Sequence, residues 1–279
     1  MNPLTFTLKI QPKFTLGVAQ LTPDNLAGLS KTEIKSLKLP YGKNEMALDT
    51  LFSVTGSDSN NIQINRSCDK LVSVGRNMSH GTINVNGDVG KVLGSYLQGG
   101  FITINGNAGS WVGNNMSGGR IDINGNAGDH IGAGKPGDTF GMTDGMIKIS
   151  GSAGDRVGDR MRSGMIIIYG KAGDFCGSRM HAGTIIVLDK AGKNPGAGMR
   201  RGTVILVKKP AHITATFKSN GNLKIQFLRL LFTQLSNMGK EFSIFKKFGP
   251  EAHRFSGDLA RNGKGEILIL QTLDLNKVA

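Results

Sequence analysis

Apolar residues recur in alternating pairs along the middle of the chain, the two members of each pair being separated by one residue. Alternation with a period of two predicts a short strand that buries one face. The pairs follow one another every 19 residues, apart from one interval of 26. The sequence therefore predicts seven equivalent strands, at Ile83/Val85, Ile102/Ile104, Ile121/Ile123, Ile147/Ile149, Ile166/Ile168, Ile185/Val187 and Val204/Leu206.

Up to three further apolar positions follow a pair, and their side chains grow from small through medium to long. The small position is usually alanine, as at Ala108, and the medium position is aliphatic or cysteine, as at Cys176. We interpret the long position as core filler rather than a metal or cofactor site, because thioethers adapt to irregular gaps in an interior. It is occupied by Leu97, Met116, Met161, Met180 and Met199.

Glycines punctuate residues 82–207 with the same 19-residue step. Glycine suits sharp corners, where φ is often positive. Asn86, Asn105 and Asn124 share one corner, where asparagine tolerates the left-handed conformation and can stack on its equivalents. Between Gly125 and Gly151 the step lengthens to 26 residues, which predicts an inserted loop at 133–144.

Nineteen residues with a glycine at nearly every corner leave no room for a helix of two or three turns, so leucine-rich repeats are excluded. We predict an all-β solenoid: a single-stranded right-handed parallel β-helix of 19-residue coils, stacked at roughly 4.8 Å. We expect irregular caps at both ends, some of whose residues are helical: Thr22 followed by Pro23 indicates a helix start, and residues 227–235 read as a buried helix. The expected organisation is an N-terminal cap over 1–61, the β-helix over 62–207 with its loop at 133–144, and a C-terminal cap over 208–279.

The net charge of +14 indicates an anionic partner: nucleic acid, an anionic surface, a polyanionic ligand or acidic subunits of a complex. The two cysteines, Cys68 and Cys176, lie in no metal-binding spacing, and we expect Cys176 to be a buried free thiol in a reducing cytoplasm. The N-terminus has no basic region followed by an apolar core, and no apolar stretch is long enough to cross a bilayer. We therefore expect a cytoplasmic protein.

No set of residues in the sequence matches a catalytic or metal-binding pattern. The histidines have no metal-ligand spacing, and Gly-Ala-Gly-Lys at 132–135 is not a phosphate loop, because Pro136 follows the lysine and lacks an amide donor. Asp129, Asp155 and Asp174 form one column. One interpretation is that these aspartates are the acid cluster of a β-helix hydrolase or lyase that acts on anionic polysaccharide. The alternative is that they are solvated side chains at a corner of the repeat.

Basic residues flank the methionine column in its last three coils. Strand alternation predicts that they point outward and form a cationic rail, whereas the earlier coils hold uncharged residues there. Such stacking is unfavourable unless an anion lies among the arginines, and arginine suits carboxylates through two-point hydrogen bonds. A solvated face remains the alternative. The rail consists of Arg160, Arg162, Arg179, Arg200 and Arg201.

The repeat resembles the glycine-rich β-helix of the glutamate synthase C-terminal domain and of the C subunit of formylmethanofuran dehydrogenase. It resembles the second more closely, over nearly the whole chain, and most of all the bacterial version in the formyltransferase/hydrolase complex of methylotrophs. The segments that carry this resemblance are GDRVGDRMRSG at 154–164, SRMHAGT at 178–184, GMRRGT at 198–203, and GDLA and GKGE at 257–260 and 263–266.

This resemblance implies a cytoplasmic complex in one-carbon metabolism. It moves a formyl group from formyl-tetrahydromethanopterin to a methanofuran-type carrier and hydrolyses it to formate. The chemistry belongs to hydrolase and formyltransferase partner subunits, so the C subunit is expected to be structural, with no active site, cofactor or metal of its own. Neither nucleic acid nor membrane is an expected partner. Because the carrier bears a chain of glutamates, we expect the rail to attract that tail or an acidic sister subunit.

Two alternatives stay open: an archaeal-type C subunit, whose complex works in the reductive direction with tungsten or molybdenum, and the polysaccharide enzyme. The expected lack of a secretion signal argues against the second.

Overall fold

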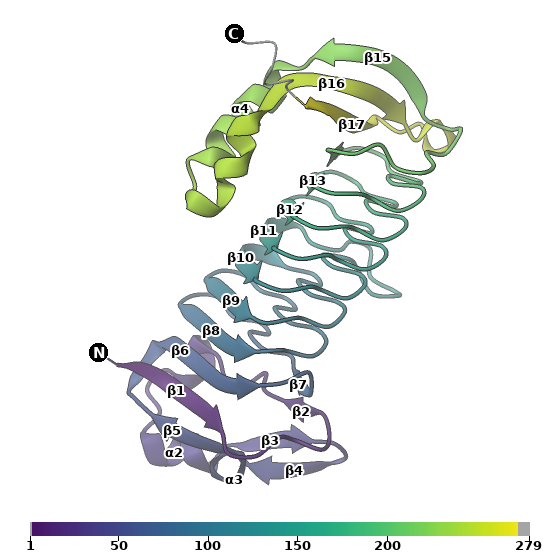
Figure 1. Cartoon of the computed structure of the whole chain (residues 1–279). Helices are drawn as coiled ribbons and strands as arrows, with labels where there is room; N and C mark the ends of the chain where they lie inside the picture. The colour runs from purple at the N-terminus through teal and green to yellow at the C-terminus, as the bar shows by residue number, and fades with distance from the viewer. Residues whose placement is uncertain (1, 273–279) are drawn as a thin grey trace.

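The computed structural model describes residues 2–272 as two sheets with a few short helices (Figure 1). The larger sheet has 13 strands in the order β15-β16-β17-β14-β13-β12-β11-β10-β9-β8-β6-β1-β5. The smaller has four, in the order β4-β3-β2-β7.

Seven parallel strands, one from each repeat, form the middle of the large sheet. Their register follows the repeat: Ile83 pairs with Ile102, Ile102 with Ile121, and across the insertion Ile121 pairs with Ile147. The alternating pairs are therefore confirmed as equivalent strands. They are β8 (Thr82–Gly87), β9 (Phe101–Asn105), β10 (Ser117–Ile123), β11 (Asp144–Ile149), β12 (Met165–Ile168), β13 (Thr184–Val187) and β14 (Thr203–Leu206).

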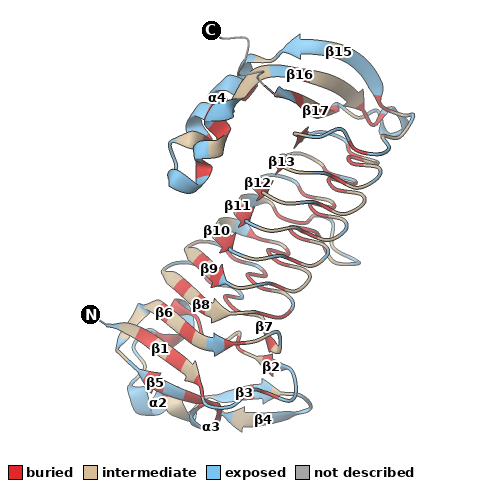
Figure 2. Ribbon diagram, viewed as in Figure 1, coloured by how far each residue is buried: buried red, intermediate tan, exposed pale blue. Residues whose placement is uncertain are grey.

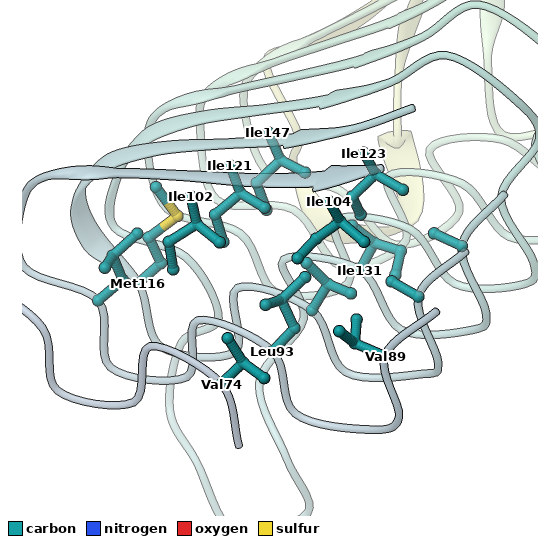
Figure 3. Close-up of a cluster of buried hydrophobic side chains, with 14 of the residues drawn as sticks. Val74, Val89, Leu93, Ile102, Ile104, Met116, Ile121, Ile123, Ile131 and Ile147 are labelled. Atoms are coloured by element: carbon teal, nitrogen blue, oxygen red, sulfur yellow. The ribbon is translucent and has the colours of Figure 1, made fainter. Parts of the chain in front are cut away.

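The inward columns build one continuous core behind this sheet (Figures 2 and 3). The long-residue column from Leu97 to Met199 is fully buried, which confirms that it fills the core. Cys176 is a buried free thiol, as expected, and burial raises its pKa to about 12. Asn86, Asn105 and Asn124 stack as predicted, each amide Nδ2 donating to the Oδ1 of the asparagine before it at 2.8 Å.

The N-terminal segment extends the large sheet and adds the small one. Its long strand β6 pairs with β8 on one side and β1 on the other. Thr22 caps α1 and Pro23 occupies its first turn, as predicted. The elements are β1 (Pro3–Leu8), β2 (Leu16–Gly17), α1 (Pro23–Leu26), α2 (Lys31–Ser36), β3 (Lys38–Tyr41), β4 (Asn44–Ala47), α3 (Leu48–Leu51), β5 (Phe52–Thr55), β6 (Asp58–Ser67) and β7 (Leu71–Val72).

The C-terminal segment closes the other end of the sheet and sends a helical arm back along it (Figure 1). β17 (Gly265–Thr272) pairs with β14, and the antiparallel strands β16 (Phe248–Gly257) and β15 (Lys218–Lys224) follow. The arm consists of α4 (Gln226–Ser236) and the 3-10 helix η1 (Lys240–Lys247). A short 3-10 helix, η2 (Leu259–Arg261), lies between β16 and β17.

The expected fold class, an all-β solenoid formed by a single-stranded right-handed parallel β-helix between irregular caps, is wrong. The regular structure is a mixed 13-stranded sheet beside a four-stranded one. Corners at positive φ interrupt each repeat after its strand, so its remainder consists mostly of turns, joined to neighbouring repeats by isolated bridges such as Val89 to Ala108. The terminal segments contribute regular strands to the same sheet, because an edge strand otherwise leaves its amides and carbonyls unpaired.

The outer face of the parallel sheet changes character along its length. One outward column begins with Asn84, Thr103, Asp122 and Lys148 and continues with Ile167, Ile186, Ile205 and Leu268. The four apolar members are fully buried against the arm, chiefly Leu228, Leu231, Phe232 and Phe245. One-sided burial, predicted from alternation, therefore fails in the second half of the sheet.

Candidate functional site

Positive charge is concentrated in the second half of the chain. Residues 156–279 contain 21 of the 34 Lys and Arg residues but only 8 of the 20 Asp and Glu residues. The five arginines of the predicted rail lie in this half, in the loops that lead into β12, β13 and β14. We therefore take this group of loops as the candidate site.

The repeat brings three of these loops into register. The backbone N–H groups of Arg162, His181 and Arg200 donate to methionine carbonyls of the preceding repeat at 2.9, 2.7 and 2.8 Å. These three residues form one column with a spacing of roughly 4.8 Å. Strand alternation was the wrong basis for predicting the rail, because the segments are loops in which Arg160 and Arg179 have φ of 58° and 52°.

Two of the five arginines are held by a buried carboxylate. Asp159 is 2% exposed and accepts hydrogen bonds from both Nε and Nη2 of Arg179 and, at 2.7 Å, from Oγ of Ser178. The hydrogen bond to Asp159 raises the pKa of Arg179. Arg160 lies 3.7 Å from the same carboxylate and donates from Nη1 to the carbonyl of Asp138 at 2.6 Å. The charges of Arg160 and Arg179 are thus partly neutralised within the protein.

The other three arginines, Arg162, Arg200 and Arg201, are exposed, and within residues 2–272 none of them forms an ion pair. The Arg162 guanidinium lies 4.8 Å from the ring centre of Phe140, and that ring meets His181 edge-on at 5.0 Å. Burial, followed by the charges of Arg200 and Arg162, lowers the pKa of His181. The neutral imidazole of His181 thus lies between Arg162 and Arg200, neither of which forms an ion pair within residues 2–272. This arrangement suits an anionic ligand.

The insertion forms one wall of this site, which sequence reasoning missed. It contributes Phe140 and the Asp138 carbonyl, and beside it lies a hollow of about 260 Å³. Its Met142 is fully buried and continues the methionine column. A signal for Met142 was present, because it follows Met116 by 26 residues, the same interval as between the flanking glycines. The hollow is lined by Asn115, Asp138, Thr139, Phe140, Gly141 and Thr143.

The aspartate column considered for polysaccharide cleavage makes backbone hydrogen bonds. The Oδ1 atoms of Asp129 and Asp155 each accept the amide N–H of the next aspartate at 2.8 Å, and Oδ1 of Asp174 accepts that of Lys193 at 2.7 Å. These carboxylates join successive repeats edge to edge. Within residues 2–272, no three His, Cys, Asp or Glu residues are grouped so as to hold a metal ion.

One serine, histidine and aspartate lie together near the N-terminal end. Nδ1 of His80 lies 3.0 Å from Oγ of Ser79 and 3.3 Å from Oδ1 of Asp24, while the Ser79 hydroxyl itself donates to Asp24. In a hydrolytic triad the histidine stands between the other two, with a different ring nitrogen facing each. The order of contacts therefore does not fit nucleophilic catalysis.

With this geometry in place, comparison with known proteins identifies the family. The GXGXG motif family model matches residues 63–229. A chain in the crystal structure of the formyltransferase/hydrolase complex (FhcABCD) from Methylorubrum extorquens with methylofuran is 36% identical, with a TM-score of 0.84. The alignment covers 95% of this chain and 98% of that one. The chain belongs to the family of formylmethanofuran dehydrogenase C subunits.

Two archaeal C subunits match over a shorter region. The C subunit of the tungsten-containing formylmethanofuran dehydrogenase 2 of Methanococcus maripaludis is 33% identical over 92 residues, which is 32% of this chain and 34% of that protein. Its counterpart in Methanothermobacter marburgensis is 36% identical over 100 residues, which is 34% of this chain and 37% of that protein. The match thus spans about a third of the length of these curated relatives. No helix within residues 2–272 has the length and apolar character to cross a membrane.

Proposed function

We propose that this C subunit is a non-catalytic scaffold in a cytoplasmic formyltransferase/hydrolase complex of one-carbon oxidation. The observation that carries the proposal is the 36% identity over 95% of the chain with a chain of the FhcABCD complex. The tungsten-containing relatives match over only about a third of the chain, which favours the formyltransferase/hydrolase type over the archaeal type. Its partners are the hydrolase and formyltransferase subunits, which use a methanofuran-type carrier and tetrahydromethanopterin.

The structural role is supported by the interactions of the reactive side chains. The aspartate column accepts backbone amides, and Cys176 is buried among apolar residues with a thiol that stays protonated at neutral pH. Within residues 2–272, no three His, Cys, Asp or Glu side chains are placed to hold a metal ion together. We assign the hydrolytic and formyl-transferring steps to the partner subunits, in keeping with the resemblance described above.

We further propose that the rail binds the glutamate tail of the carrier. Arg162, Arg200 and Arg201 are exposed and lack ion pairs within the described residues. Arg162 and Arg200 are two repeats apart and Arg201 is adjacent to Arg200 in sequence. Arginine binds carboxylates through paired hydrogen bonds. Arg160 and Arg179 border the site while being held by Asp159. The carrier tail would then be tethered beside the catalytic subunits while its formyl end moves between active sites.

Co-expression with the hydrolase and formyltransferase subunits of the source organism tests the scaffold role. We expect a stable complex that turns over formyl-tetrahydromethanopterin, and no turnover by the isolated chain. A chain that fails to co-purify with these subunits, or that catalyses either step alone, contradicts the proposal.

A further inference from the structure

The arm and the strand that leads into it carry three exposed apolar side chains. Leu223, Phe227 and Leu230 are 38%, 45% and 71% exposed. Leu223 comes from the end of β15, and Phe227 and Leu230 come from the first turns of α4, whose Leu228, Leu231 and Leu235 are buried. We call these three exposed residues the apolar stripe. Clustered exposed apolar side chains of this size are typical of surfaces that another molecule covers.

The same arm has a hollow between α4, η1 and the start of β16. Its volume is about 260 Å³, and Phe232, Phe245 and Phe248 form its apolar floor. Arg229 and Lys246 line the same hollow. Its size and lining suit an apolar side chain inserted from a partner, an anchor common at the centre of protein interfaces.

The arm and the strand residues on either side of it are strongly basic. Residues 218–250 contain six Lys and Arg residues and a single acidic residue, Glu241. Glu241 is already paired with Arg120 at 3.3 Å. Within residues 2–272, Lys224, Arg229, Lys246 and Lys247 have no ion pair. Glu251, the residue that follows this range, lies opposite Lys224 in the pairing of β15 with β16. The remaining excess of positive charge favours a partner that supplies carboxylates.

We propose that the apolar stripe and the hollow of the arm form the docking surface for an acidic protein subunit of the complex, separate from the rail. This inference rests on the proposed scaffold function and assigns that function a surface. The partner inserts an apolar side chain into the hollow and places carboxylates against Lys224, Arg229 and Lys246. A second copy of this chain would bring like charges together. A lipid surface does not require a hollow of side-chain size.

Two arm variants and one matched control test the proposal in the full-length chain. The first, Phe227→Ser with Leu230→Ser, removes the apolar stripe; the second, Lys224→Glu with Arg229→Glu and Lys246→Glu, reverses the charges. The control, Ile10→Ser with Phe14→Ser, removes two apolar side chains that are 58% and 60% exposed at the far end. Circular dichroism and thermal unfolding check that each variant folds as the parent does, since all replaced side chains lie at the surface.

Affinity for the separately purified hydrolase and formyltransferase subunits is then measured by calorimetry at two salt concentrations. We expect each arm variant to bind one of them roughly tenfold or more weakly than the parent. The charge variant should also lose most of the salt dependence, and the control should bind as the parent does. Arm variants that bind both subunits as tightly as the parent overturn the proposal while leaving the scaffold function intact.

Three other outcomes also count against it. A parent chain that binds neither subunit contradicts the scaffold function itself. Self-association of the parent that the arm variants abolish would assign the surface to a second copy. Binding of the parent, but not the arm variants, to vesicles of anionic phospholipid, without binding to either subunit, would assign it to a membrane.

Discussion

The two halves of the parallel sheet share one interior and differ outside it. Inside, the same columns of isoleucine and long apolar residues run from β8 to β14 without a change of character. Outside, the first half presents polar residues such as Asn84 and Thr103, whereas the second presents Ile167, Ile186 and Ile205 to the arm and arginines to solvent. The interior residues determine how the repeats stack. The outer surface of the second half carries the features that a simple stack of repeats would lack, namely the covering arm and the exposed arginines.

The largest effect is expected where the outer face is covered. Ile186→Asp places a carboxylate beneath the arm, where Ile186 is fully buried, and should destabilise the fold by about 4 kcal/mol or detach the arm. Asn84→Asp introduces the same group into the same column in the first half. It should change the free energy of unfolding by less than about 0.5 kcal/mol. Urea unfolding of both variants checks the comparison, and equal losses would mean that the two outer faces do not differ.

The rail gives the next largest effect. Replacing Arg162, Arg200 and Arg201 by glutamate should weaken the binding of a short oligoglutamate peptide roughly tenfold or more and reduce its salt dependence. Replacing Lys13, Lys38 and Lys43, which are exposed near the N-terminal end, changes the net charge equally and should leave much more of the binding. Arg179 is a poorer choice, because its removal leaves the buried Asp159 without its main cation.

Equal losses from both triple variants would contradict a defined site and leave only the overall charge as the attraction. Fluorescence anisotropy of a labelled peptide at several salt concentrations measures both quantities.

We expect a smaller loss of stability, equal in the two halves, when a side chain that joins neighbouring repeats is removed. Asp155→Ala leaves the amide of Asp174 without its acceptor, and Asp88→Ala does the same to Asn107 in the first half. Each should cost about 1 kcal/mol, and asparagine at either position should restore most of it. A loss of stability at only one position, or a loss of enzymatic turnover at Asp155 without a loss of stability, would contradict the structural role of the column.

The smallest effect is a pH dependence confined to the second half. Burial and two neighbouring arginines lower the pKa of His181, so the free site holds a neutral imidazole at pH 7. Bound carboxylates favour the charged form and raise that pKa, so binding takes up a proton and tightens as the pH falls from 7.5 to 6.0. We expect about a threefold gain, while glutamate itself stays ionised. His181→Gln should flatten the profile, and affinity that rises with pH in the parent would contradict this interpretation.

The sequence predicts the interior of this molecule better than its outer surface. Repeat spacing is a local property of the chain, so the buried pairs, the methionine column and the asparagine stack could all be read from it. The covered outer face left a signal of a different kind: three consecutive apolar residues at 166–168, 185–187 and 204–206 indicate a strand buried on both sides. The arm that covers it is remote in sequence, and no periodicity links the two.

The site was only partly predictable for the same reason. Arginine positions follow the repeat, but Asp159 holds Arg179 from the neighbouring repeat, and Phe140 reaches His181 from the insertion. The loops differ in length between repeats, so three-dimensional packing, and not repeat spacing, decides which residues become partners of the arginines and of His181. The predicted β-helix class was wrong for a related reason. Glycine spacing indicates where the chain turns. It does not indicate how many residues between two turns stay extended and form regular strand pairs.

Cryo-electron microscopy of the assembled complex with its carrier tests the central claim most directly. We predict protein density over Phe227 and Leu230, and carrier density beside Arg162, Arg200 and Arg201, with the outer face from β8 to β10 left open. Contacts confined to that first half, with the arm and the rail facing solvent, would contradict it.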